Sequence, residues 1–127
     1  MPLNILVVED HDVNREMICL RLRRLGHRVA EARNGAEAVA MVQLDPPDII
    51  IMDLSMPVMD GVEAWRMINE LVDAPPPVIA LTAVAIRDME LTCADLGFGA
   101  YLTKPVNFST LNAAIQNLTG AERAIAV

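Results

Sequence analysis

The sequence predicts an α/β fold in which a five-stranded parallel sheet carries helices on both faces. Two observations support this prediction. Short apolar runs alternate with amphipathic stretches along the chain, and the central runs contain almost no polar residues. Strands that are apolar throughout are typical of parallel sheets, because helices cover both of their faces. The 127 residues, 54% of them hydrophobic, are enough for one domain with a single sheet.

The first half of the chain contains two strand–helix units. Residues 4–8 form an apolar strand, whereas residues 28–32 include Arg28 and Glu31, so we expect the second strand at an edge of the sheet. A glycine ends the first helix and a pair of prolines ends the second. Apolar positions at three- and four-residue spacing are expected to face the core: Val13, Met17, Ile18, Leu22 and Leu25 in the first helix, and Ala36, Val39, Ala40 and Leu44 in the second.

The second half continues the alternation. Residues 48–52 and 77–81 are expected to form buried central strands, and residues 100–102 to form the last strand. Three further helices are expected between and after them. Their apolar positions are Val62, Trp65, Ile68 and Leu71 in the third helix, Ile86, Met89, Leu91 and Leu96 in the fourth, and Leu111, Ala114, Ile115 and Leu118 in the fifth.

Asp60 and Glu63 stand at the expected start of the third helix. An acid followed three residues later by glutamate, just before a helical apolar repeat, is typical of a capping box. We therefore interpret both residues as a structural cap, worth about 1 kcal/mol.

Composition excludes several classes of protein. No apolar run approaches the roughly 20 residues of a membrane helix, and the opening residues lack the pattern of a signal peptide, so we expect a cytoplasmic domain without membrane contact. The net charge of −7 argues against direct binding of nucleic acid. Cys19 and Cys93 are isolated and form no metal or redox motif. We expect one domain over residues 1–120, with residues 121–127 as a C-terminal tail or a truncated linker.

Polar residues follow the expected central and last strands. In an open parallel sheet, ligands bind beyond the carboxyl ends of the strands, so side chains at these positions face one crevice. The residues are Glu9 and Asp10 after the first strand, Asp53 after the third, Thr82 after the fourth and Lys104 after the fifth.

The acids in this set favour a hard cation. The first turn contains Glu9 and Asp10 in place of a glycine-rich phosphate loop, which disfavours a dinucleotide. Two like charges about 4 Å apart repel by about 4 kcal/mol at an effective dielectric of 20, so clustered carboxylates need protons or a cation. Oxygen ligands suit Mg²⁺, with Mn²⁺ possible. The alternative is that Glu9 and Asp10 cap the next helix, although His11 or Asp12 is better placed to do so.

Lys104 is the only lysine in the chain, since the other nine of the ten basic residues are arginine. Lysine is a compact charge that suits contact with a phosphate or a carboxylate, although a solvated surface lysine remains an alternative. The Thr82 hydroxyl is either a local cap or a hydrogen-bond donor to a ligand. Tyr101, in the last strand, is most simply a residue that packs at the sheet edge.

Together these motifs resemble response-regulator receiver domains. The acid pair in "VEDHDVNREM", the segment "MDLSMPVMDG", Thr82 before Ala83, and "YLTKP" occur in order over residues 3–119. The sequences of these segments are most similar to those of receivers of hybrid sensor histidine kinases. The resemblance implies a doubly wound (βα)₅ fold with the flavodoxin-like strand order 2-1-3-4-5.

The resemblance also implies residue roles. Asp53 would be the phosphoacceptor that attacks a phosphohistidine of a histidine kinase or a histidine phosphotransfer protein. Asp10, Asp53 and the backbone carbonyl of Ser55 would bind Mg²⁺ directly, and Glu9 would act through water. Lys104 would pair with Asp53 and then with the phosphoryl group, with the Lys104–Pro105 peptide bond in cis.

Signalling would follow from a local switch. Thr82 would donate its hydroxyl to the phosphoryl group, Ala83 would leave room for that group, and Tyr101 would turn inward. The surface made by the fourth helix, the fifth strand and the fifth helix would then change and meet an effector domain or protein. Ser55, Met56 and Val84 would tune the lifetime of the aspartyl phosphate.

Two other functions are consistent with parts of the pattern. A Mg²⁺-dependent phosphohydrolase could use Asp53 as nucleophile, but such enzymes usually carry a second acid two residues later, where this chain has Ser55. A degenerate receiver would act only as an interaction module, and the complete set of acids, threonine and lysine argues against it. As a receiver, the chain would catalyse its own phosphorylation and dephosphorylation rather than turn over small substrates.

Overall fold

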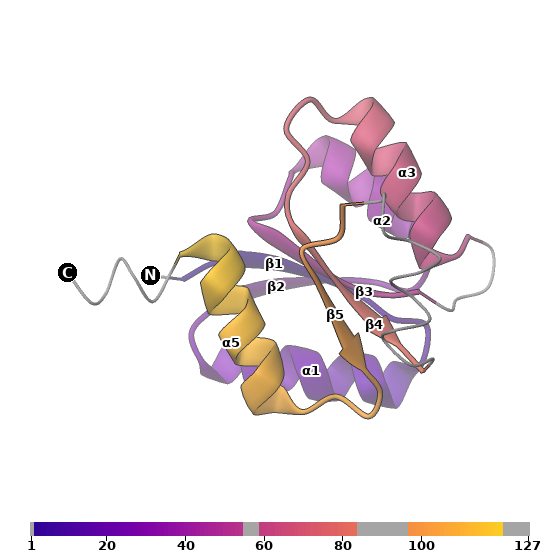
Figure 1. Ribbon diagram of the computed structural model, residues 1–127. Helices are drawn as coiled ribbons and strands as arrows, with labels where there is room; N and C mark the ends of the chain where they lie inside the picture. The colour runs from indigo at the N-terminus through magenta and orange to yellow at the C-terminus, as the bar shows by residue number, and fades with distance from the viewer. Residues whose placement is uncertain (1, 55–58, 84–96, 121–127) are drawn as a thin grey trace.

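The computed structural model describes residues 2–54, 59–83 and 97–120. They form one sheet of five parallel strands in the order β2-β1-β3-β4-β5, which confirms the expected topology. Helices α1 and α5 lie on one face of the sheet, and α2 and α3 lie on the other (Figure 1). The elements are β1 (Asn4–Val8), α1 (Asp12–Arg24), β2 (Arg28–Ala32), α2 (Gly35–Leu44), β3 (Ile49–Asp53), α3 (Gly61–Leu71), β4 (Val78–Thr82), β5 (Ala100–Thr103) and α5 (Phe108–Thr119).

Strands β3 and β4 each begin and end one residue later than the sequence pattern predicted. Asp48 lies outside β3, where its carboxylate accepts a 2.8 Å hydrogen bond from the Asn4 N–H. Pro77 precedes β4 because proline has no N–H for the sheet, although its carbonyl still accepts from Ile50 at 3.0 Å. The shift makes Asp53 and Thr82 the last residues of their strands, where pairing with the neighbouring strand holds their backbones in place.

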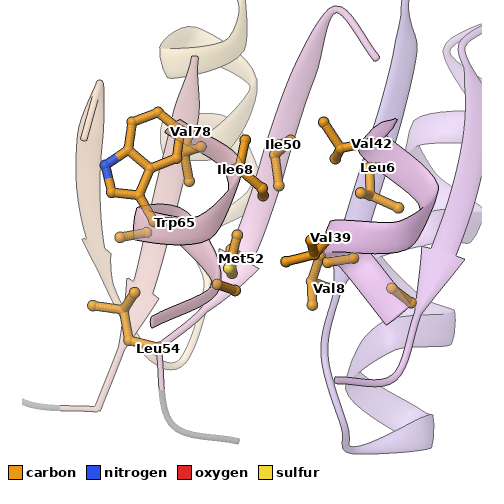
Figure 2. Packing of buried hydrophobic residues seen from close by; sticks show 14 of the residues in the cluster. Leu6, Val8, Val39, Val42, Ile50, Met52, Leu54, Trp65, Ile68 and Val78 are labelled. Carbon is orange, nitrogen blue, oxygen red and sulfur yellow. The ribbon is translucent and has the colours of Figure 1, made fainter. Parts of the chain in front are cut away.

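The two faces of the sheet form two separate hydrophobic clusters. Alternate residues of a strand point to opposite faces, so Leu6 and Val8 of β1 join α2 and α3, whereas Ile5 and Val7 join α1 and α5. Figure 2 shows the first cluster, in which Trp65 packs beside β3 and β4. Strand β2 is an edge strand, as expected, since it pairs only with β1.

The buried face of α1 differs from the predicted one. Val13 and Met17 are 58% and 60% exposed, and Leu25 is also exposed, whereas Ile18 and Leu22 are buried as expected. The face that packs on the sheet instead runs through positions 15, 18, 19 and 22 and includes Arg15. An apolar repeat alone did not identify this face, because a buried arginine interrupts it.

The other helices follow the prediction to different extents. In α2, Val39 is buried as expected but Ala36, Ala40 and Leu44 are exposed, and the packed face instead passes through positions 35, 38, 39 and 42. Trp65 and Ile68 of α3 are buried as expected, while Leu71 is exposed. The expected face of α5 is also observed, with two buried and two partly buried residues: Leu111, Ile115, Ala114 and Leu118. The fourth expected helix lies outside the described residues.

Polar side chains cap all four described helices at their N-termini. His11 accepts from the Asn14 N–H and so caps α1, one of the two residues expected to do so. Asp60 accepts a 2.9 Å hydrogen bond from the Glu63 N–H at the start of α3. Within the described ranges, no helix is long and apolar enough to cross a bilayer.

Candidate functional site

The predicted polar residues meet at the carboxyl ends of the central strands. Glu9 follows β1 directly, Asp53 is the last residue of β3, and Thr82 is the last residue of β4. All three are buried, and Asp53 is only 2% exposed. Asp10 is exposed at the rim. The parallel register brings these strand ends to one edge of the sheet, as the sequence pattern predicted.

Three carboxylates and one ammonium group form the centre of this site. One oxygen from each of Glu9, Asp10 and Asp53 lies within 4.8 Å of the other two. The Lys104 Nζ donates to Asp53 Oδ2 at 2.9 Å and to Glu9 Oε1 at 3.1 Å. The lone lysine of the chain therefore joins two buried acids that are 44 residues apart in sequence, which argues against an ordinary surface lysine.

This arrangement raises the pKa values of both Glu9 and Lys104. Burial, followed by the neighbouring Asp53 carboxylate, raises the pKa of Glu9 to about 7, although Lys104 works against the increase. Burial on its own would lower the pKa of Lys104, but its hydrogen bonds to Asp53 and Glu9 outweigh that effect and raise it. The lysine therefore stays charged, while Glu9 carries an unfavourable negative charge above neutral pH.

The site has the donor set of a hard divalent cation. All three acidic ligands offer carboxylate oxygens, and these are the ligands that Mg²⁺ prefers. In addition, Glu9 Oε2 is buried and has no hydrogen-bond partner among the residues that the structure describes, which is unusual for a carboxylate oxygen. A cation or its bound water would satisfy this oxygen, so the residues fit the metal that the sequence suggested.

The remaining predicted residues are described only in part. Tyr101 is half-buried, and its ring meets Phe98 edge-on at 5.5 Å between centroids. Ala83 is exposed beside Thr82, and the peptide bond between Lys104 and Pro105 is cis. Ser55, Met56 and Val84 lie outside the described residues, so the expected carbonyl ligand is not part of the described site.

Sequence reasoning missed two residues that support the acids. Arg15 is buried and donates to the backbone carbonyl of Glu9, and its place among the apolar positions of the α1 face was the available signal. Gly61 approaches the end of β3 so closely that an added Cβ would lie 2.6 Å from the Asp53 carbonyl oxygen. The contact between Gly61 and Asp53 joins the start of α3 to the end of β3, and no pattern in the sequence indicated it.

Comparison with known proteins agrees with this geometry. Residues 5–116 match the family described as "Response regulator receiver domain". The transcriptional regulatory protein PdtaR of Mycobacterium tuberculosis is 38% identical over 117 residues, which cover 91% of this chain and 56% of PdtaR. The chain thus spans about half the length of this curated relative.

Two solved structures share the fold and much of the sequence. A receiver domain of sensor histidine kinase PA1611 from Pseudomonas aeruginosa, with magnesium coordinated in its active-site cleft, is 36% identical with a TM-score of 0.85, covering 95% of this chain and all of that one. The co-crystal structure of Saccharomyces cerevisiae phosphotransfer protein Ypd1 and the receiver domain of Ssk1 contains a chain that is 30% identical with a TM-score of 0.88. That match covers 95% of this chain and 91% of that one.

Proposed function

Because this chain belongs to the response regulator receiver domain family, we propose that Asp53 accepts a phosphoryl group from a phosphohistidine of a histidine kinase or a histidine phosphotransfer protein. The observation that carries this proposal is the contact of Lys104 with Asp53 inside a cluster of three carboxylates. The structures of a kinase receiver and of the Ypd1–Ssk1 pair support the two classes of donor. Residues 1–120 would form the receiver unit.

The reaction follows from the position of Asp53. A carboxylate oxygen attacks the phosphorus of the phosphohistidine, the P–O bond forms as the P–N bond breaks, and the imidazole leaves with the electron pair. Phosphoryl transfer depends mainly on positioning and on neutralising charge. Burial in β3 holds Asp53 in place, and Lys104 at 2.9 Å can follow the negative charge from the carboxylate to the phosphoryl oxygens.

The site would use Mg²⁺, with Mn²⁺ as an alternative. Asp10 and Asp53 would bind the ion directly, and Glu9 would act through water. This role accords with the buried Glu9 oxygen, which has no hydrogen-bond partner in the described part of the chain. The ion supplies positive charge for the phosphoryl oxygens and relieves repulsion among the carboxylates. The Ser55 carbonyl, as a third direct ligand, is proposed from the family resemblance alone.

A groove beside Lys104 supports docking of the donor protein on this side. The groove has a volume of about 620 Å³ and runs between α1 and the segment that leads into α5. Its lining includes Met17, Ile18 and Phe108 next to Lys104, and Met17 is largely exposed. A phosphohistidine on a protein surface must approach an acid that is almost completely buried. A groove lined by both apolar and polar residues at the rim suits such a partner.

Phosphorylation of Asp53 would then change a second surface of the domain, which a partner would recognise. Thr82, buried at the end of β4, would donate its hydroxyl to the phosphoryl group. Tyr101, half-buried in the neighbouring β5, would turn inward and alter the surface formed by the fourth helix, β5 and α5. An effector domain or protein would meet that surface, within a cytoplasmic phosphorelay.

The direct test is incubation with acetyl phosphate and Mg²⁺ followed by intact mass measurement. The wild type should gain the mass of one phosphoryl group, and the gain should vanish with EDTA. Asp53→Asn should gain none. Asp60→Asn is the matched control, because Asp60 is an exposed helix cap in the same segment and should leave labelling unchanged.

Two outcomes would reject the proposal. Absence of labelling in the folded wild type would favour an interaction module, and equal labelling of Asp53→Asn would place the phosphoryl group elsewhere. Repeated turnover of unrelated phosphomonoesters would favour the hydrolase alternative.

A further inference from the structure

Arg15 is a buried cation outside the predicted site. Among the described residues, four polar or charged ones are buried, and three of them (Glu9, Asp53 and Thr82) belong to the candidate site. The fourth is Arg15, which is 5% exposed on the packed face of α1. A charged side chain is rarely buried unless each of its groups has a partner, so the contacts of Arg15 indicate its purpose.

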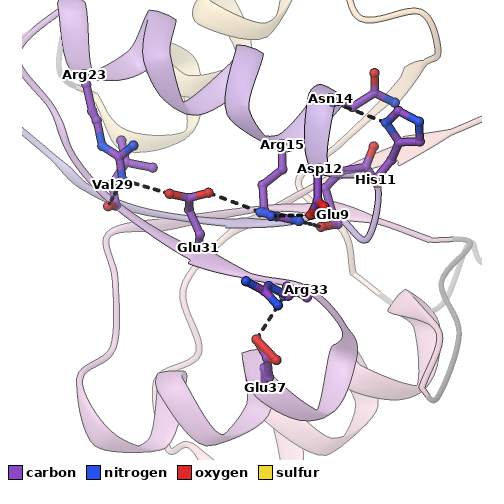
Figure 3. A network of polar contacts seen from close by, with 10 residues as sticks. All are labelled: Glu9, His11, Asp12, Asn14, Arg15, Arg23, Val29, Glu31, Arg33 and Glu37. Atoms are coloured by element: carbon purple, nitrogen blue, oxygen red, sulfur yellow. Dashed lines mark hydrogen bonds and ion pairs between the residues drawn. The ribbon is translucent and has the colours of Figure 1, made fainter.

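Three contacts use the planar guanidinium group as a fork. Nη1 donates to the backbone carbonyl of Glu9 at 2.9 Å, Nε donates to Glu31 Oε1 at 3.1 Å, and Nη2 donates to Asp12 Oδ1 at 2.6 Å. Glu31 on β2 is in turn held by Arg23, whose Nη2 lies 3.1 Å from Glu31 Oε2. Figure 3 shows this chain of contacts from Arg23 through Glu31 and Arg15 to the end of β1.

The contact with Glu9 acts on the peptide unit between the two acids of the site. The Glu9 N–H donates to the Ala32 carbonyl at 3.0 Å, so β2 holds this residue from one side and Arg15 holds it from the other. The carbonyl of Glu9 and the N–H of Asp10 share one rigid plane. Fixing that carbonyl therefore restricts the directions in which both the Glu9 and Asp10 side chains leave the backbone.

We propose that Arg15 is a positioning residue that orients Glu9 and Asp10 toward Asp53 and thereby sets the affinity of the site for Mg²⁺. The inference rests on the proposed function, since it requires the carboxylate cluster to bind the ion. Arg15 acts through the backbone of Glu9, whose carbonyl accepts its hydrogen bond. The edge strand β2 contributes to the site through Glu31, which keeps the guanidinium group in place.

The sign of the effect separates positioning from simple electrostatics. Arg15 is positively charged, so its long-range field opposes the binding of a divalent cation. If charge alone mattered, removing it would strengthen Mg²⁺ binding. Positioning predicts the opposite, because residues that orient metal ligands typically contribute roughly 10- to 100-fold to metal affinity.

The experiment is a Mg²⁺ titration of the wild type and of three variants: Arg15→Met, Arg15→Lys and Arg23→Met. The changes in the amide NMR shifts measure the binding of Mg²⁺. Arg23→Met is the matched control, because it removes the same charge from the same helix and also breaks a contact with Glu31, but it leaves the bond to Glu9 intact. We expect Arg15→Met to weaken Mg²⁺ binding about tenfold and Arg23→Met to change it by less than about twofold.

Two further measurements guard against a purely structural effect. Arg15→Lys keeps the positive charge but lacks the planar guanidinium group. If Arg15→Met fails to fold, Arg15→Lys should still fold, and it should bind Mg²⁺ more weakly than the wild type. In the metal-free protein, the carbonyl ¹³C resonance of Glu9 and the amide of Asp10 should shift in both Arg15 variants. The same resonances should hold their positions in Arg23→Met.

Each result decides the question. Wild-type or tighter Mg²⁺ binding in a folded Arg15 variant overturns the proposal, as does equal weakening in Arg23→Met. If the wild type itself binds no Mg²⁺, the proposed function falls together with this inference. If the wild type binds Mg²⁺ and accepts phosphate but the Arg15 variants bind equally well, only the inference fails.

Discussion

Glu9→Gln should stabilise the metal-free protein in alkaline solution, although it removes a hydrogen-bonded acid. Glu9 is 1% exposed, and one of its oxygens has no hydrogen-bond partner within residues 2–54, 59–83 and 97–120. Burial and the adjacent Asp53 carboxylate raise the pKa of Glu9 from 4.5 to about 7 in the folded protein. Glutamine keeps the shape of the protonated acid and avoids the buried charge.

The size of the effect follows from proton linkage. The folded state holds the Glu9 proton more tightly than the unfolded state, so stability from this group is full below the unfolded pKa near 4.5. It is lost as the pH rises toward the folded pKa of about 7. At about 1.4 kcal/mol per pKa unit, a rise from 4.5 to about 7 corresponds to a loss of at most about 3.5 kcal/mol. The attraction of Lys104 is already included in the pKa of about 7, so we expect a net gain of about 1–3 kcal/mol at pH 8.

The assay is urea denaturation in EDTA at several pH values from 5 to 8. The fluorescence of Trp65 can report unfolding, because this single tryptophan is buried against Phe98. The difference between Glu9→Gln and wild type should be small at pH 5 and should grow toward pH 8. Glu16→Gln, at an exposed position of α1, should stay within about 0.5 kcal/mol of the wild type throughout.

The result that would refute this reasoning is a difference that does not depend on pH, or a Glu9→Gln variant that is less stable at pH 8 than at pH 5 relative to the wild type. Adding Mg²⁺ at pH 8 supplies a second check. The ion should stabilise the wild type more than the variant and so reduce the difference.

Three further predictions concern the neighbours of Asp53. Asp10→Asn should weaken Mg²⁺ binding, since it removes one of three clustered carboxylates, and an unchanged metal titration would contradict its assignment as a ligand. Lys104→Arg should slow labelling by acetyl phosphate although the charge is kept, because a planar guanidinium group does not fit where a compact ammonium contacts both Asp53 and Glu9; wild-type labelling rates would show that charge alone suffices. Gly61→Ala should lower the free energy of unfolding by more than about 1 kcal/mol, because the new methyl group would meet the Asp53 carbonyl oxygen at 2.6 Å and overpacking of this kind costs about 1–3 kcal/mol; unchanged urea midpoints would show that the loop yields freely.

The residues of the site could be predicted more completely from the sequence than the packing of the helices around them. Asp53 and Thr82 stand at the ends of apolar strands, and the parallel direction of these strands brings both residues to one edge of the sheet. Lys104 was found from its rarity in the composition. The buried face of α1 was predicted only in part, because Arg15 looks like a surface residue in sequence and is buried by its contacts with Glu9, just after β1, and with Glu31 on β2.

The sequence by itself determined the fold class, the strand order that the family resemblance implied, and the chemical identity of the site. The fold class and the site residues depend on local periodicity and on which residues follow each strand, and both can be read along the chain. The strand order came from the resemblance of the motifs to a known family. Only the tertiary structure decided that Lys104 contacts Glu9 as well as Asp53, that the pKa of Glu9 rises, and that Arg15 holds the Glu9 carbonyl. Such properties depend on distances between segments far apart in sequence and on exclusion of water, and neither exists until the chain has packed.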